Sequence, residues 1–333
     1  MKKLLYTLLI FSVFFASCKK DEDETETTIT VSMEAGQTND VYYSFIDGEV
    51  SSVNRSDWDL AFSVPLRTAT ILINEGAGVY LFMVGDTTTW ESVDTTGMAS
   101  WLPLYNDKSD WMRGAFNLDA DGGFDFGWAI YDHANTHNVW GLYVYVIKLS
   151  NGSYKKLFIR KRIGSTDTYV LRWADIDGSN QIDATFSPAA YAGAKHFIHY
   201  SLVDEDIVEA EPDNDTWDLL FTRYIEKIPT GPDSEMDYPV MGVLINKDLK
   251  ALKLTGIDPA VAHYSDASGS FTNQADIIGW DWKIQDPVTH EISIAENTSY
   301  FVKLLNDEIY KIYFTEYTGV ATGSITIRQQ KIE

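Results

Sequence analysis

Two histidines stand four residues apart in a short polar segment, and their type and spacing suggest metal chemistry. His133 and His137 lie within residues 131–138, Tyr-Asp-His-Ala-Asn-Thr-His-Asn. Such spacing would place both rings on one face of a helix. The flanks are strand-like and the segment is rich in Asn, so we expect a loop. Neutral imidazole is a common ligand for iron, and a solvated turn residue is the alternative interpretation of each ring.

Two acidic segments offer the oxygen ligands that calcium prefers. Asp175, Asp177 and Asp183 lie in one segment, and residues 119–125 form the other. Hard cations favour clustered oxygens on a flexible loop. Neither segment has the EF-hand spacing, because the glycine comes two positions early. The segments therefore predict either a calcium site or a plain Asp-Gly turn between strands.

The chain carries no recognised catalytic motif. We find no Gly-x-Ser-x-Gly elbow, no Gly-x-x-x-x-Gly-Lys-Ser/Thr loop and no His-Glu-x-x-His. With 49 acidic residues, no pair of carboxylates can be singled out as a glycosidase dyad. We therefore expect a binding protein and not an enzyme.

Charge and cysteine content narrow the partners. The 26 Lys and Arg against 49 Asp and Glu give a net charge of −23. Nucleic acids and anionic lipid surfaces attract basic proteins, so we expect no nucleic-acid partner and no charge-driven membrane binding. The one cysteine excludes an intrachain disulfide and a zinc site built on several thiolates.

The N-terminus has the pattern of a lipoprotein signal. Two lysines precede an apolar run over residues 4–15, about the length of a signal-peptide core. The run ends in Phe-Ala-Ser-Cys, which resembles a lipobox with Cys18 as the lipidated first residue; a chance cysteine after an ordinary signal peptide is the alternative. We expect a signal peptide at 1–17 and a lipidated acidic tether at 18–27. The acidic run resembles the export signal of Bacteroidetes surface lipoproteins, which implies an outer-membrane lipoprotein exposed on the cell surface and held by lipid.

Strand signals dominate the rest of the chain. Residues 142–147 form an apolar β-branched and aromatic run, Asn-Gly follows at 151–152, and residues 154–159 return as a second strand. A matching hairpin is expected from 300–304 and 309–314, and a closing strand at 324–328. Only residues 188–196 suggest a short helix. These signals predict a mostly β protein with antiparallel sheets and few short helices.

Five sequence blocks recur in the same order in the two halves of the chain. The pairs are 42–47 with 199–204, 58–62 with 217–221, 71–74 with 243–246, 127–128 with 279–280, and 147–164 with 302–319. We therefore expect two tandem domains, 28–180 and 184–333, each of a normal size for an independent folding unit. In both Trp-Asp-Leu blocks, at 58–60 and 217–219, we expect the Trp in the core and the Asp bonded to a local backbone turn.

Both halves resemble the HmuY family of bacterial haem-binding lipoproteins. The resemblance rests on the Trp-Asp-Leu blocks, on the terminal segment 300–327, and on Gly127-Trp128 followed after four residues by His133. It implies two tandem HmuY-like antiparallel β domains and makes His133 the first candidate for an axial haem ligand. In the second half Gln285 stands where this His would be, so we expect no haem coordination there.

The resemblance also implies a second axial ligand. The first half has no His before His133. Met98, Met112 and His137 remain as candidates, since thioether and imidazole both ligate haem iron. Tyr131 and Trp140 are near enough in sequence to cover a porphyrin face.

The resulting hypothesis is a surface lipoprotein that binds haem for iron acquisition without catalysis. Its partners would be haem or haemoproteins, and a TonB-dependent receptor in the outer membrane. The alternative is a non-haem binding or adhesion module on the same fold, in which Trp and Tyr line a groove for a glycan or protein ligand.

Overall fold

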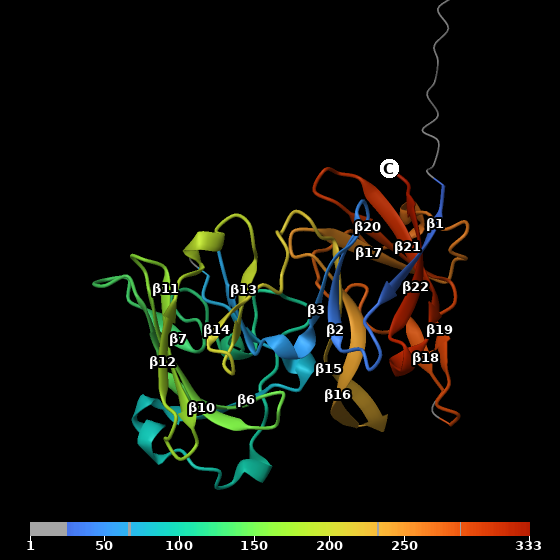
Figure 1. The fold of residues 1–333 in the computed structure, drawn as a ribbon. Helices are drawn as coiled ribbons and strands as arrows, with labels where there is room; N and C mark the ends of the chain where they lie inside the picture. The colour runs from blue at the N-terminus through green and yellow to red at the C-terminus, as the bar shows by residue number, and fades with distance from the viewer. Residues whose placement is uncertain (1–24, 66–67, 232, 287) are drawn as a thin grey trace, which may run out of the picture.

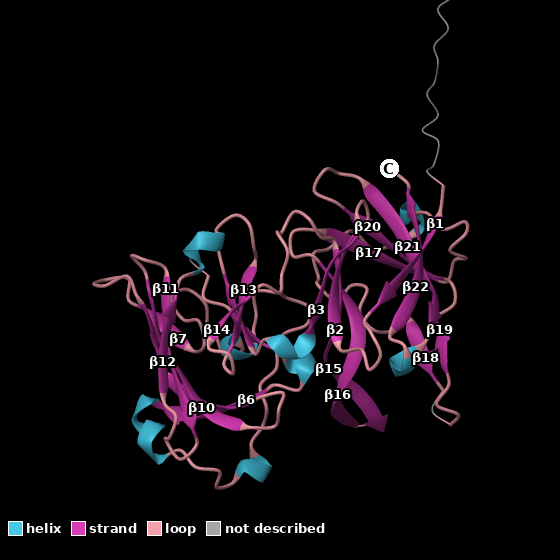
Figure 2. Ribbon diagram, in the orientation of Figure 1, coloured by secondary structure: helices cyan, strands magenta, loops and turns pink. Residues whose placement is uncertain are grey.

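The computed structural model describes residues 25–333 except 66–67, 232 and 287. This part of the chain consists of antiparallel strands, short 3₁₀ turns and loops (Figure 2). It contains no α-helix. The 3₁₀ turns are η1 Arg55–Asp57, η2 Glu75–Ala77, η3 Thr87–Ser92, η4 Met98–Ser100, η5 Ala115–Asn117, η6 Pro188–Tyr191, η7 Tyr264–Asp266 and η8 Gly319–Ala321. The prediction of a mostly β fold with few short helices is confirmed.

The strands form two bodies, which lie side by side in Figure 1. We call β4–β14 the first body. One of its sheets has the order β14-β13-β4-β5, and the other joins β6 and β9 to β12-β11-β10-β8-β7. The strand bounds are β4 Leu60–Ser63, β5 Ile71–Ile73, β6 Tyr80–Asp86, β7 Ala129–Tyr131, β8 Val139–Gly141, β9 Tyr143–Lys148, β10 Tyr154–Ile163, β11 Thr168–Asp175, β12 Ile182–Phe186, β13 Phe197–Ser201 and β14 Asp206–Val208. Side chains from both sheets, such as Phe62 and Trp173, share one buried core.

The second body contains β1–β3 and β15–β22. Its sheets have the orders β1-β22-β21-β20-β17 and β16-β15-β2-β3, with β18-β19 as a separate ribbon. The bounds are β1 Thr27–Ser32, β2 Asn39–Ser44, β3 Gly48–Asn54, β15 Leu219–Gly231, β16 Ser234–Ile245, β17 Lys250–Thr255, β18 Lys283–Gln285, β19 Ile292–Ile294, β20 Thr298–Lys303, β21 Ile309–Tyr317 and β22 Ser324–Lys331. Its core joins Tyr43 and Phe45 from the start of the chain to Phe221 and Ile327.

The chain exchanges strands between the two bodies. Strand β2 pairs with β15, which places Tyr43 opposite Leu219. Strand β13 pairs with β4, which places Tyr200 opposite Leu60. Residues 27–54 therefore complete the second body, and residues 182–208 belong to the first. The expected boundaries 28–180 and 184–333 do not coincide with the two bodies. The strand pair near the start of each half, β2-β3 or β13-β14, joins a sheet with strands of the other half.

Two equivalent aspartates fasten the exchanged strands. Oδ2 of Asp218 accepts a hydrogen bond from the N–H of Phe45 at 2.7 Å, and Oδ2 of Asp59 accepts one from Leu202 at 2.8 Å. Burial raises the pKa of both carboxyls to about 6. The expected bond from Asp to a turn is present, but the turn lies far away in the sequence and is not local. Both preceding Trp side chains were expected in the core: Trp217 is buried, whereas Trp58 is half-buried and packs against a smaller cluster that includes Ala61.

The predicted hairpins form where expected. Strands β9 and β10 pair with Lys148 opposite Tyr154, and Gly152 turns the chain with a positive φ of 84°. Strands β20 and β21 pair in the same way, with Lys303 opposite Ile309, and β22 closes the sheet. The short helix expected near residues 188–196 is the 3₁₀ turn η6.

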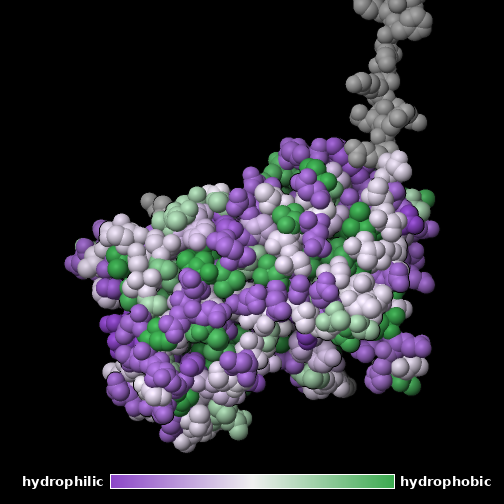
Figure 3. Space-filling view, viewed as in Figure 1, coloured by the Kyte–Doolittle hydropathy of each residue, from purple (hydrophilic) through white to green (hydrophobic). Residues whose placement is uncertain are grey.

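The surface of both bodies mixes hydrophilic and apolar residues on the face shown in Figure 3. No helix among the described residues is long and apolar enough to cross a membrane. The expected signal peptide and the lipidation site Cys18 lie outside the described residues.

Candidate functional site

The two candidate histidines lie on the loop between β7 and β8, residues 132–138, which we call the histidine loop. The Asp132 carboxylate accepts hydrogen bonds from the N–H groups of Asn135 and Thr136, both at 3.1 Å, and from the Thr136 hydroxyl at 2.9 Å. These bonds, the Thr136 hydroxyl first among them, hold the pKa of Asp132 below its usual range. His137 closes the loop with a left-handed φ of 55°. The prediction of a loop instead of a helix agrees with this geometry.

Each histidine ring contacts an aromatic neighbour. His133 stacks on Phe124 with ring centroids 4.2 Å apart and planes 9° from parallel. Nδ1 of His137 lies 3.0 Å from the Tyr131 hydroxyl. Both imidazoles are exposed. Since a hydrogen bond at one ring nitrogen orients the ring and leaves the other nitrogen for a ligand, His137 can present Nε2.

A cleft of about 530 Å³ opens beside the histidine loop. We call it the histidine cleft, and its lining includes Phe124, Phe126, Tyr131, His137, Val139 and Arg162. Arg162 forms a buried ion pair with Asp167. The described lining is therefore mainly aromatic, and the charge of the one arginine in it is balanced by Asp167.

The methionine candidates lie elsewhere. Met98 begins η4, and Met112 packs against Ala61 and Leu72 and lines a neighbouring pocket. The described lining of the histidine cleft contains neither methionine. Trp140 lies on β8, 41% exposed, with the Lys161 ammonium 5.0 Å from its ring. Of the predicted ligands, only His137 lines the cleft itself. His133 reaches the edge of the cleft, because it stacks on the lining residue Phe124.

The three aspartates predicted as calcium ligands contact protein groups in the structure. Asp175 and Asp177 both accept from the Ser179 hydroxyl, at 3.3 and 2.6 Å. Asp183 lies on β12 and accepts from Arg172 Nε at 2.9 Å. In the described part of the chain no group of three His, Cys, Asp or Glu side chains is placed to hold a metal ion. The contacts of Ser179 with Asp175 and Asp177 fit an Asp-Gly turn between strands, and calcium binding here stays a prediction.

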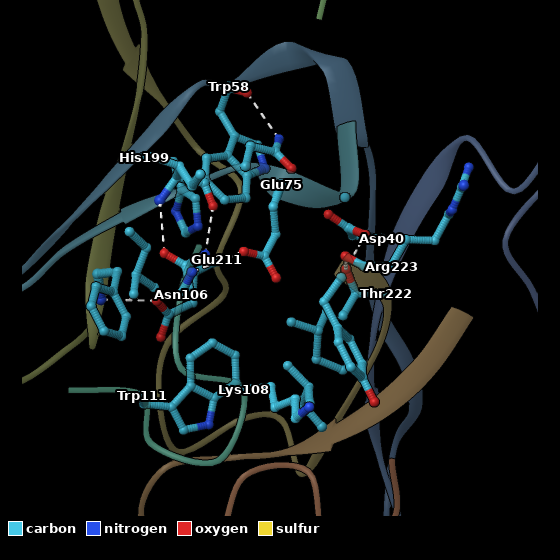
Figure 4. A pocket seen from close by; sticks show the side chains of 18 of the residues that line it. Asp40, Trp58, Glu75, Asn106, Lys108, Trp111, His199, Glu211, Thr222 and Arg223 are labelled. Carbon is cyan, nitrogen blue, oxygen red and sulfur yellow. Dashed lines mark hydrogen bonds between the residues drawn. The ribbon is translucent and has the colours of Figure 1, made fainter. Parts of the chain in front are cut away.

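A second cavity, of about 90 Å³, lies where the two bodies meet. We call it the junction cavity, and Figure 4 shows Glu75 and Glu211 on one side of it and Trp111 on the other. The lining also includes Trp58 and His199 from the first body and Trp217 from the second.

Glu75 connects the two bodies across this cavity. Its Oε1 accepts a hydrogen bond from the N–H of Ile225 in the second body at 2.9 Å, and its Oε2 accepts one from Asn106 in the first at 2.9 Å. The side chain is almost fully buried. Desolvation raises its pKa to about 7, because burial disfavours the charged carboxylate more than the two N–H groups favour it.

Glu211 has the same kind of surroundings. Its two oxygens accept from the N–H groups of His196 at 3.0 Å and Phe197 at 2.9 Å. Desolvation raises the pKa of this carboxyl to about 7 as well. Burial lowers the pKa of the neighbouring His199 to about 3, so that ring is neutral. The junction cavity thus combines two carboxyls that titrate near neutrality with a neutral imidazole.

Sequence reasoning did not identify this cavity. Glu75 and Glu211 are two of 49 acidic residues, and neither lies in a recognisable motif. Their burial results from contact between the bodies, which follows from the strand exchange. The one available signal was that Glu75 directly follows a recurring block, residues 71–74.

The fold and sites define a two-body antiparallel β protein with an aromatic cleft beside the histidine loop and a cavity between the bodies that is lined by two buried carboxyls. The chain matches no protein-family model and no curated protein. Among solved structures it is similar to a crystal structure of an HmuY-like protein from Bacteroides vulgatus to which heme binding is attributed. The identity is 14%, the match covers 50% of this chain and 92% of that one, and the TM-score is 0.18.

Proposed function

We propose that this protein binds haem reversibly in the histidine cleft and does not transform it. The observation that carries the proposal is the placement of the histidine loop: His137 lines an aromatic cleft, and His133 lies at its edge on Phe124. An exposed imidazole nitrogen can ligate ferric haem iron, and aromatic rings can cover the porphyrin.

The sequence motif and the geometry favour different histidines as the axial haem ligand. The Gly-Trp motif favours His133 as the axial ligand. The geometry favours His137, because its Nδ1 is oriented by Tyr131 and its ring already lines the cleft. His133 would first have to leave its stacked position on Phe124. We propose His137 as the ligand that the cleft itself provides, with His133 as the alternative.

An absorption titration with ferric haem tests both points. Residues 19–333 are prepared without lipid as wild type, His137→Ala, His133→Ala and the double variant, with His290→Ala as a surface control. We expect a saturable one-to-one Soret shift that weakens at least about tenfold in His137→Ala and persists in the control. Loss in His133→Ala alone would transfer the ligand role to His133. No saturable shift in the wild type would refute haem binding.

The cellular role is proposed on the sequence pattern of the N-terminus. A lipid on Cys18 would hold the protein at the outer membrane, exposed on the cell surface, where it takes haem from haemoproteins. It would then transfer haem to a TonB-dependent receptor. Radiolabelled palmitate incorporation that is lost in Cys18→Ala, and surface proteolysis of intact cells, test the anchor and the exposure.

A further inference from the structure

We propose that the junction cavity is a second binding site, independent of the histidine cleft, and that it takes a small organic amine in its ammonium form. The cavity lies between the bodies and measures about 90 Å³, a size suited to a molecule of a few non-hydrogen atoms. Asp107 and Lys108, which also line it, are partly exposed, so the cavity meets solvent on their side.

Two buried nitrogen atoms in the lining lack partners. Nδ1 of His199 and Nε1 of Trp217 make no hydrogen bond within the described residues, although the two side chains are only 6% and 4% exposed. Buried polar groups are almost always paired, with protein or with a bound molecule. A neutral His199 whose proton is on Nε2 can accept a hydrogen bond from an ammonium group at Nδ1. The indole N–H of Trp217 is a donor, so its partner would be a water that the ammonium ion brings with it.

The carboxyls of Glu75 and Glu211 give the site its preference for a cation. Each oxygen accepts one backbone N–H, which leaves further lone pairs available to the cavity. No ion pair neutralises either carboxyl among the described residues; Lys108 is itself paired with Glu226. An ammonium group would add a directly paired positive charge and further hydrogen-bond donors.

Aromatic rings also line the junction cavity. Trp111 and Trp217 meet edge to face with centroids 6.5 Å apart, and Trp58 lies against His199 at 4.5 Å. Indole faces attract cations through their quadrupole, and more strongly where water is excluded. Carboxylates and indoles together recognise an alkylammonium group better than they recognise a neutral molecule of the same shape.

The charged neighbours set the expected pH dependence. Lys108 and Glu226 face Glu75, and Lys195 and Lys247 face Glu211. Both carboxyls have a pKa of about 7. Because only the ionised carboxylates attract an ammonium ion, amine affinity should rise as the pH increases from about 6 to about 8.

The test uses ethylammonium chloride as the probe, ethanol as its neutral match and sodium chloride as the salt control. Binding to residues 19–333 is followed by saturation-transfer NMR and by thermal unfolding. We expect saturable binding of ethylammonium alone, strengthening with pH and weakening at least about tenfold in Glu211→Gln. Glu75→Gln, which removes the other ionisable carboxyl, should weaken binding in the same way if Glu211→Gln does not fold. His137→Ala, in the other site, should leave amine binding unchanged.

Two outcomes would overturn the proposal. Equal binding of ethanol and ethylammonium would show that the carboxyls do not select a cation. No saturable binding of ethylammonium at pH 8 would show that the cavity holds water only. Since the haem titration uses a separate cleft, its failure would not affect this result.

Discussion

The two buried carboxyls of the junction cavity should make the protein less stable as the pH rises. Glu75 and Glu211 have folded-state pKa values of about 7, above the ordinary value of 4.5. At pH values between 4.5 and about 7, the folded state therefore still holds protons that the unfolded state has released. The stabilisation is complete below pH 4.5 and is lost as the pH increases through 7. One unit of pKa corresponds to about 1.4 kcal/mol, so each carboxyl contributes a change on the order of 3 kcal/mol.

The measurement is urea unfolding followed by tryptophan fluorescence at several pH values from 4.5 to 8. Wild type is compared with Glu211→Gln, which cannot ionise, and with Glu49→Gln, the same change at an exposed position. Other titrating groups are common to all three proteins and cancel in the differences. We expect the stability of wild type relative to Glu211→Gln to fall by roughly 2–3 kcal/mol across this range, with Glu49→Gln flat by comparison. A flat difference for Glu211→Gln would refute the assignment of a buried, protonated carboxyl.

Three further predictions concern the fastening of the strands, the histidine loop and the independence of the bodies. Asp59→Ala and Asp218→Ala should each lower the free energy of unfolding by about 1–3 kcal/mol, because each leaves a backbone N–H of an exchanged segment unpaired; unchanged urea midpoints would contradict this. Gly164→Ala should weaken haem binding while the fold persists, since its Cβ would lie 1.9 Å from the His137 carbonyl oxygen and must displace the histidine loop; an unaltered haem titration would count against the role of the loop. A fragment of residues 55–208 should unfold cooperatively in circular dichroism, because it contains every strand of the first body, whereas 209–333 lacks β1–β3 and should not fold; cooperative unfolding of 209–333 would contradict the observed strand pairing.

Local sequence signals predicted the strands well. An apolar run, an Asn-Gly turn and a second run predict the hairpin of β9 and β10. All three signals lie within about 20 residues of one another, so local sequence is sufficient to predict this hairpin. The histidine loop was predicted for the same reason: Asn and Asp side chains bond to their own backbone and oppose a helix.

Pairing between the halves could not be predicted from the sequence. The blocks around Leu60 and Leu219 are nearly the same, as are those around Tyr43 and Tyr200. A strand that fits beside one Trp-Asp-Leu block fits beside the other almost equally well, so local patterns do not decide between them. The choice depends on the connections and on contacts between the bodies. The junction cavity depends on those same contacts, and for this reason Glu75 and Glu211 were missed.

The pairing of β1 with β22 also affects the order in which the molecule can assemble. Thr27 lies opposite Gln329, so the first strand of the described chain meets its partner only when the last strand is present. The first body is complete once residue 208 has emerged, while β1–β3 still lack their sheet. During that interval their edges are open to pairing with other chains. We infer that the second body folds late and slowly, since its closing contacts span nearly the whole chain.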